Sequence, residues 1–207
     1  MNSTLTRILL ATHNRHKAGE FQDLLKGLGI GIETLDMFPQ VGEIAEDADT
    51  LRGNALAKAR EVCRLTGVPS MGDDTGLEVS YLHDEPGVLS SRYAGPGATY
   101  ADNVRKLLNN LRGVPPRRRG ARFRCVLALV LPDGREEFAE GVCRGVIIEE
   151  PRGINGFGYD PVFLPEHCAL TFAEMDAALK NSISHRARAI NDMKEILSGI
   201  LLPVKGR

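Results

Sequence analysis

Two adjacent carboxylates, Asp73 and Asp74, lie in the segment 71–77, which reads Met-Gly-Asp-Asp-Thr-Gly-Leu between two apolar runs. Neighbouring carboxylates repel each other, and about 4 to 6 Å apart they are readily tolerated if a proton or a divalent cation lies between them. This pair of residue types can therefore bind a hard metal ion. The alternative is an ordinary polar turn in which both acids only cap backbone N–H groups.

The elements around this pair determine where it is held. Residues 68–72 form a short strand-like run, Gly76 permits a sharp turn, and residues 77–82 alternate between apolar and polar as a strand does. This pattern predicts that Asp73 and Asp74 lie at a strand end, which is where α/β sheets hold their ligands.

The N-terminal segment predicts a second functional loop. Residues 7–11 are an apolar run typical of a buried strand, and apolar side chains from Ala18 to Leu28 then recur at helical spacing. The polar turn between them consists of Thr12, His13, Asn14, Arg15, His16 and Lys17. With Asn14 as N-cap, the first helical N–H groups and Lys17 would form a phosphate site, although the spacing is not that of a Walker loop. Alternatively, Asn14 is only a cap and Lys17 is solvated.

A helix predicted at residues 50–66 would present two polar side chains to the same site. Thr50 is its cap, and Asn54 and Lys58, four residues apart, share one flank beside an apolar side. Glu46, in the acidic stretch 43–49, can supply a third carboxylate for a cation. The alternative is that Glu46 and Asp47 are exposed loop acids and that Lys58 is a surface lysine.

Two segments near the C-terminus contain further candidate binding residues. Residues 153–160 combine glycines with Phe157, whose ring could contact the face of a purine. A plain glycine-rich turn with a core Phe is the alternative. Ser184 is expected to cap the last helix, so that His185 and Arg186 project from its first turn, with Lys180 one turn before. Basic residues at a helix N-terminus oppose the helix dipole, which suggests that a partner compensates them.

These motifs, taken in order, resemble one family from about residue 7 to about residue 198. The chain resembles the ITPase (Ham1/RdgB-like) family of non-canonical purine nucleoside triphosphate pyrophosphatases. Small departures are Thr75 where members usually carry Ser, His13 where they often carry Gly, and Leu51 where they often carry Phe. The resemblance rests on Thr12-x-Asn14-x-x-Lys17, Glu46, Asn54-Ala55, Lys58-Ala59, Asp73-Asp74-Thr75-Gly76-Leu77, Ser91-Arg92-Tyr93, Phe123-x-Cys125-Val126, Gly156-Phe157-Gly158-Tyr159-Asp160-Pro161 and Lys180-Asn181-x-Ile183-Ser184-His185-Arg186.

The resemblance implies Mg²⁺-dependent hydrolysis of ITP, dITP and XTP to the monophosphate and pyrophosphate. It implies a long mixed sheet in two lobes around a deep cleft, and a homodimer. Asp74 is the candidate for accepting the proton of the attacking water, Glu46 and Asp74 for holding the metal, and Asp73 for supporting them. The residues expected to bind substrate are Thr12, His13, Asn14, Arg15, His16, Lys17, Asn54, Lys58, Asp73, Thr75, Phe157, Gly158, Tyr159, Asp160, Lys180, Ser184, His185 and Arg186.

Composition agrees with a compact cytoplasmic enzyme that forms a single domain over residues 1–207. The formal net charge of −1 argues against a general nucleic-acid binder, and no 18-residue apolar span predicts a membrane helix. The run 117–119 of three arginines is interpreted as a solvated loop. The four cysteines form no Cys-x-x-Cys pair and are interpreted as reduced thiols, Cys63 and Cys125 as packing residues.

The predicted fold class is mixed α/β. Helices are expected at residues 15–27, 50–66, 99–112 and 184–198, and strands near 7–11, 69–73, 77–82, 122–131, 135–147 and 160–164. Pro132-Asp133-Gly134 predicts a hairpin turn, so part of the sheet should be antiparallel.

Two other functions remain open from the sequence. A Maf-like pyrophosphatase would act on other modified nucleotides, although the segments 156–160 and 184–186 count against it. A non-hydrolytic nucleotide sensor would use the same ligand site, although the complete set of carboxylates counts against that function.

Overall fold

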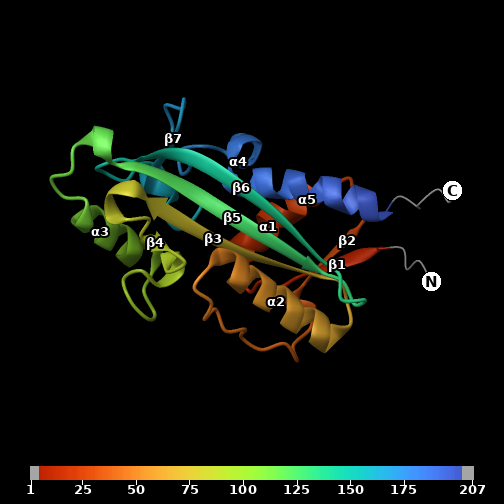
Figure 1. Cartoon of the computed structure of the whole chain (residues 1–207). Coiled ribbons are helices and arrows are strands. Elements are labelled where there is room, and N and C mark those ends of the chain that lie inside the picture. Colours follow the sequence, from red (N-terminus) through yellow and green to blue (C-terminus); the bar gives the residue numbers. More distant parts are fainter. Residues whose placement is uncertain (1–4, 202–207) are drawn as a thin grey trace. The chain divides into compact units, whose positions relative to one another are not determined.

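The computed structural model describes residues 5–201, which form five α-helices and one seven-stranded sheet (Figure 1). The helices are α1 (Arg15–Leu25), α2 (Leu51–Thr66), α3 (Tyr100–Asn110), α4 (Ala177–Ile183) and α5 (His185–Leu201). The strands are β1 (Arg7–Leu10), β2 (Gly31–Thr34), β3 (Ser70–Val79), β4 (Pro86–Gly87), β5 (Gly120–Val130), β6 (Glu136–Ile147) and β7 (Phe163–Pro165). Within residues 5–201, none of the helices combines the length and apolar character that a membrane span requires.

The sheet is mixed, as predicted. Its strand order is β2-β1-β3-β5-β6-β7, with β4 paired to β3 beside this path. Strand β1 is parallel to β2 and β3, whereas β4 is antiparallel to β3 and β7 is antiparallel to β6. The predicted hairpin turn between β5 and β6 is confirmed, since the N–H of Leu131 donates to the carbonyl of Arg135 at 2.9 Å. Gly134 adopts the positive φ of 88° that this turn requires.

The chain forms two compact units, and strands β3, β5 and β6 contribute residues to both. The first unit comprises Met1–Asp74, Val126–Gly141 and Ala187–Arg207, and the second comprises Thr75–Cys125 and Val142–Arg186. In the first unit, α2 and α5 cover opposite faces of the sheet (Figure 1). Helix α2 lies so close to β3 that a Cβ atom on Gly72 would be 2.1 Å from the carbonyl oxygen of Ala55.

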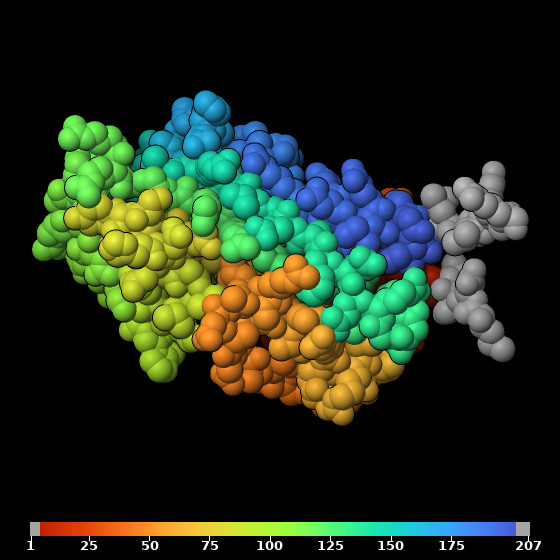
Figure 2. Space-filling view, viewed as in Figure 1, coloured from red at the N-terminus to blue at the C-terminus, as the bar shows by residue number. Residues whose placement is uncertain are grey.

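The outer flank of α2 is held by the β5–β6 hairpin, whose atoms lie against those of the helix at the surface (Figure 2). The guanidinium of Arg60 donates twice to the carboxylate of Glu136, at 2.5 and 3.0 Å. The guanidinium of Arg52 lies 3.6 Å from the ring centroid of Phe138. These contacts involve the flank of α2 opposite Asn54 and Lys58, because residues two or six positions apart in a helix point in different directions.

The second unit has an aromatic core. The ring of Phe123 packs edge-on against Phe163 at 4.7 Å and parallel to Phe172 at 6.0 Å. Apolar side chains of α3, among them Leu107, are buried in the same cluster. The core therefore joins strands β5 and β7 to α3 and to the segment that precedes α4.

The structure corrects the prediction for the two adjacent acids. Strand β3 continues without a break from Ser70 to Val79, so Asp73 and Asp74 lie inside a strand and not at its end, and Gly76 does not form a turn. The local sequence favours a turn, but a strand forms because lysines from distant segments compensate the acids, as described below. The second expected strand ends at Val79, and residues Ser80–Leu82 form a 3-10 helix instead.

Other differences concern short elements. Helix α4 and strands β2 and β4 were not predicted, because seven or fewer residues carry too little periodicity to identify them. The expected strand at 160–164 begins only at Phe163. Arg119 is buried, contrary to the prediction, and donates to the carbonyls of Ile147 and Leu111 at 2.7 and 3.0 Å. Cys63 and Cys125 are buried free thiols, as predicted.

Candidate functional site

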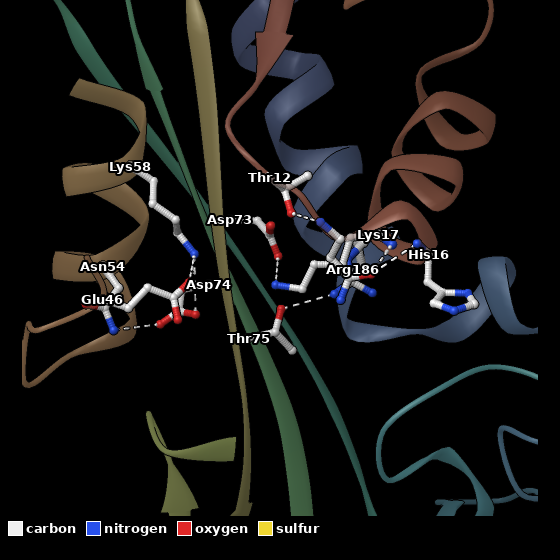
Figure 3. Close-up of polar contacts among 11 residues, drawn as sticks. Thr12, His16, Lys17, Glu46, Asn54, Lys58, Asp73, Asp74, Thr75 and Arg186 are labelled. Carbon is white, nitrogen blue, oxygen red and sulfur yellow. Dashed lines mark hydrogen bonds and ion pairs between the residues drawn. The ribbon is translucent and has the colours of Figure 1, made fainter. Parts of the chain in front are cut away.

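The predicted site residues fall into two groups, one in each compact unit. The first group lies in unit 1 and contains Asp73, Asp74, Glu46 and the two lysines (Figure 3). Asp73 is buried, and its Oδ2 lies 2.7 Å from Nζ of Lys17, which is in the first turn of α1. Successive residues of a strand point to opposite faces, so Asp73 and Asp74 are directed to different partners. The strand thereby separates the two like charges.

Asp74 faces helix α2 and shares a lysine with Glu46. Nζ of Lys58 lies 2.6 Å from Oε1 of Glu46 and 3.7 Å from Oδ1 of Asp74. Lys58 is buried on the flank of α2 that the sequence predicted, so the interpretation as a surface lysine is wrong. Two carboxylates that are far apart in the sequence thus converge on the positive charge of Lys58.

Asn54 has a supporting role that the sequence analysis missed. Its Nδ2 donates to Oδ2 of Asp74 at 3.1 Å, and its Oδ1 accepts from the N–H of Ala48 at 2.9 Å. The buried amide therefore ties the acidic loop that carries Glu46 to strand β3. Only the spacing of Asn54 and Lys58 pointed to this region, since a side-chain contact with a backbone N–H leaves no sequence signal.

Burial and charge shift the pKa values of this group in a consistent direction. Burial raises the pKa of the Asp74 carboxyl above its ordinary value, although the charges of Lys58 and Lys17 oppose this. Burial alone would lower the pKa of Lys58, but the nearby carboxylates, led by Asp73 and Asp74, outweigh it and raise this pKa. The shift at Asp74 therefore follows from burial, whereas the shift at Lys58 follows from the surrounding negative charge.

The charge balance and the ligand types suit a divalent cation. Three carboxylates and two lysines leave the group with one excess negative charge. Within residues 5–201, no three His, Cys, Asp or Glu side chains gather into a complete metal site. Mg²⁺ is usually bound through only one or two carboxylates, with substrate phosphates and water as its other ligands. Glu46 and Asp74 therefore fit this ion as a pair of carboxylates.

The loop before α1 is organised as a helix cap. Oδ1 of Asn14 accepts from the N–H groups of His16 and Lys17, at 3.0 and 3.3 Å, and Thr12 Oγ1 accepts from the N–H of Asn14. The predicted N-cap is confirmed. A phosphate at this helix end would have to share two of the amide donors with Asn14. The side chains of His13, Arg15 and His16 are exposed.

The second group lies in unit 2 and is built around Asp160. Oδ2 of Asp160 accepts from the N–H of Phe157 at 2.9 Å and from Nζ of Lys180 at 2.7 Å. Gly156 has a φ of 71°, and a Cβ atom there would lie 2.0 Å from the same carboxylate oxygen. The tight turn therefore requires glycine at position 156 and places the half-buried ring of Phe157 5.0 Å from Nζ of Lys180.

Arg186 belongs to the same group and is not a surface residue. Only 1% of it is exposed, its Nη2 donates to Oγ1 of Thr75 at 3.2 Å, and its guanidinium lies 5.8 Å from the ring centroid of Phe157. His185 is also buried and stacks on Phe123, with ring centroids 4.6 Å apart. The compensation expected for these basic residues thus includes a hydroxyl and aromatic rings.

Three other expected residues have different settings. Tyr159 is buried and its hydroxyl donates to the carbonyl of Ser90 at 2.9 Å, so its side chain supports the loop. Ser184 is buried and directly precedes α5, with the extended backbone that an N-cap residue adopts. Gly158 has a positive φ of 63°, and no atom within 4 Å would meet a Cβ there.

Comparisons with known proteins show the family to which the chain belongs. The family model described as "Ham1 family" matches residues 8–196. A dITP/XTP pyrophosphatase from Desulforamulus reducens is 44% identical over 196 residues, which is 95% of this chain and 98% of the relative. Another dITP/XTP pyrophosphatase, from Nitratidesulfovibrio vulgaris, is 47% identical over 199 residues, with 93% of this chain and 96% of the relative covered.

A solved structure of a HAM1 protein from Coxiella burnetii has a TM-score of 0.85 and 40% identity to this chain. The comparison covers 93% of this chain and 98% of that chain. Both groups of side chains lie within the matched residues 8–196. The chain therefore belongs to the Ham1 family.

Proposed function

We propose that this protein hydrolyses the non-canonical purine nucleoside triphosphates ITP, dITP and XTP to the monophosphate and pyrophosphate, and so removes them from the nucleotide pool. The observation that carries this function is the group of three carboxylates and two lysines around the buried Asp73 and Asp74. The names of the relatives, dITP/XTP pyrophosphatases of nearly the same length, support the substrate class.

The first group receives the triphosphate. A nucleoside triphosphate carries about four negative charges, which Lys17 and Lys58 partly neutralise when they turn from their carboxylates to phosphate oxygens. Arg15, His16 and the capped start of α1 add donors at the helix end. Release of the two lysines leaves the carboxylates with more negative charge, so phosphate binding and cation binding favour each other.

Mg²⁺ held by Glu46 and Asp74 would offset phosphate charge and lower the pKa of an attacking water. Asp74 accepts the proton of the water that attacks the α-phosphorus. Burial raises its pKa and so favours proton uptake, whereas the charge of a bound Mg²⁺ would oppose it. Asp73 and Asn54 hold the neighbouring side chains in place.

The second group receives the purine. The half-buried ring of Phe157 offers a stacking surface, and Arg186 and His185 offer donors to the 6-oxygen of hypoxanthine or xanthine. Adenine carries an amino group at the 6-position, which would leave buried donors without acceptors. Sites built around buried hydrogen bonds reject such mismatches strongly.

A panel of nucleoside triphosphates with Mg²⁺, read out as pyrophosphate release, tests this function. ITP, dITP and XTP should be hydrolysed, and ATP and the pyrimidine triphosphates at least about a hundredfold less efficiently, which is roughly 2.7 kcal/mol in transition-state binding. Orthophosphate as the first product would contradict attack at the α-phosphorus. Turnover of modified pyrimidine or guanine nucleotides alone would favour a Maf-like activity, and binding without any turnover would favour a sensor.

The same proposal includes a cytoplasmic location, a homodimer and a single domain. The free thiols of all four cysteines suit a reducing compartment. Residues 8–196 match one family model without interruption, which supports one functional domain over both compact units. Light scattering after gel filtration measures the oligomeric state, and a monomer at micromolar concentration would contradict the dimer.

A further inference from the structure

Tyr100, a residue outside the site described above, lies beside the ring proposed to receive the purine. It is the first residue of α3, and its ring centroid is 6.0 Å from that of Phe157, with the two planes tilted by 42°. Tyr100 is 43% exposed, so packing in the core does not account for an aromatic residue at this position. Two neighbouring aromatic rings, both open to solvent in part, form a surface suited to a flat aromatic ligand.

The backbone segments that carry both rings are held by hydrogen bonds. A capping box holds the first turn of α3, because Thr99 Oγ1 accepts from the N–H of Asp102 and the carboxylate of Asp102 accepts from the N–H of Thr99. Phe157 is fixed by the bond from its N–H to Asp160. Because these backbone segments are ordered before ligand binding, stacking of a base loses little backbone entropy.

We propose that Tyr100 is a second stacking residue for the purine and extends the surface of Phe157. This inference rests on the proposed function and deepens it. The tilt of 42° at a separation of 6.0 Å leaves no room for a base between the two rings. A base stacked on Phe157 therefore meets Tyr100 at its outer side, where the phenol ring covers apolar surface that Phe157 alone would leave in water. Tyr100 then contributes to nucleotide affinity and not to the chemical step.

Kinetics of Tyr100→Ala, Tyr100→Phe and the matched control Tyr81→Ala test this proposal. Tyr81 is a similarly exposed tyrosine of the same unit, at 38%, and it contacts Arg118. In Tyr100→Ala, KM for ITP should rise about fivefold to tenfold with kcat unchanged, the lower part of the range for loss of one stacking ring. Tyr100→Phe retains the ring and should keep the parent KM, as should Tyr81→Ala.

Ligand binding separates stacking from other effects. Calorimetry should show weaker binding of inosine monophosphate to Tyr100→Ala, whereas inhibition by inorganic tripolyphosphate, which has no base, should stay at the parent value. Equal weakening for both ligands, an unchanged KM, or a change of oligomeric state in Tyr100→Ala alone would overturn the proposal. If the parent protein binds inosine monophosphate but hydrolyses no triphosphate, the proposed function fails while the stacking role is still tested by this binding.

Discussion

Asp74 is the residue on which the proposed chemistry depends most, and its surroundings set its basicity. It is buried in strand β3, accepts a hydrogen bond from Asn54 and lies near Lys58, within a group of excess negative charge. Desolvation favours the neutral carboxyl, which is the form produced when Asp74 takes a proton from water. Burial therefore favours protonation of Asp74 and disfavours its charged form.

Asp74→Asn keeps the shape of the side chain and removes its charge, so kcat should fall at least about a hundredfold with the fold intact. The matched control is Asp47→Asn, an exposed acid next to Glu46, which should retain parent turnover. Near-normal turnover of Asp74→Asn at saturating Mg²⁺ would make Asp73 the candidate base instead.

The same substitution should also stabilise the protein in the absence of metal. Asp74→Asn removes a buried negative charge from a group that has one in excess, so thermal unfolding in buffer with a chelator should occur at a higher temperature than for the parent. Addition of Mg²⁺ should raise the unfolding temperature of the parent and not of the variant. A lower unfolding temperature of the variant in chelator would show that Asp74 is net stabilising.

Arg186→Ala tests how the protein recognises the purine base. If Arg186 donates to the 6-oxygen, kcat/KM for ITP should fall by about 1 to 3 kcal/mol while the poor rate on ATP hardly changes. Because Arg186 is buried beside Thr75, Arg186→Lys and a melting curve for each variant check that the fold is retained. Arg188→Ala, an exposed arginine of the same helix, is the control. Parallel loss on both substrates would assign Arg186 to a structural or phosphate role.

At the scale of elements, the turn at residues 156–160 is held by one carboxylate, that of Asp160. Gly156→Ala should lower both stability and nucleotide affinity, because a positive φ costs a non-glycine residue about 1 to 2 kcal/mol and its Cβ would also meet Asp160. Gly158→Ala has a similar φ but open space around it, so it isolates the backbone cost. Equal melting temperatures and equal KM values for the two variants would show that contact with Asp160 is unimportant.

The elements also show what the sequence could and could not predict. Long periodic segments such as α2 and the β5–β6 hairpin were predicted because each carries its own pattern and turn residues. The course of β3 was not, because Asp73, Asp74 and Gly76 resemble a turn locally and only their contacts with Lys17 and Lys58 reveal a strand. Short elements such as β2 and α4 depend on pairing and packing that sequence periodicity does not record.

The sequence indicated which residues of the candidate site lie together, but it did not indicate what each side chain does there. The spacing of Asn54 and Lys58 and the adjacent acids pointed to one group, which the structure brings together in unit 1. The sequence could not indicate that Asp160 would hold Phe157 and Lys180, or that Tyr159 would turn its hydroxyl to Ser90. Such roles follow from side-chain direction, which depends on the fold around each residue.

At the scale of the whole molecule, the chain passes between its two compact units at four places, and each lies inside or directly beside a regular element. The passages follow Asp74, Cys125, Gly141 and Arg186. Neither unit is a continuous stretch of chain, so neither can form completely until the other part of each shared strand has been ordered. We expect a single cooperative unfolding transition, as small single domains show.

Circular dichroism of the backbone and tyrosine fluorescence, followed in the same urea titration, measure this cooperativity. Coincident curves with one midpoint would support a single domain. The chain has no tryptophan, and Tyr81, Tyr93, Tyr100 and Tyr159 all belong to the second unit, so fluorescence reports on that unit alone. Separate midpoints for the two signals would indicate two domains that unfold independently.

The stacked imidazole of His185 should give a distinctive signal in a proton NMR spectrum. Its ring lies 4.6 Å from that of Phe123 at an angle of 16°, whereas the other four histidines, His13, His16, His83 and His167, are exposed. Ring currents in a face-stacked phenyl group shift the resonances of protons above it upfield. In a proton NMR spectrum, the ring signals of His185 should therefore lie upfield of those of the other four histidines. Its movement on titration with a nucleotide would report, without any label, whether a ligand reaches the aromatic core of the second unit.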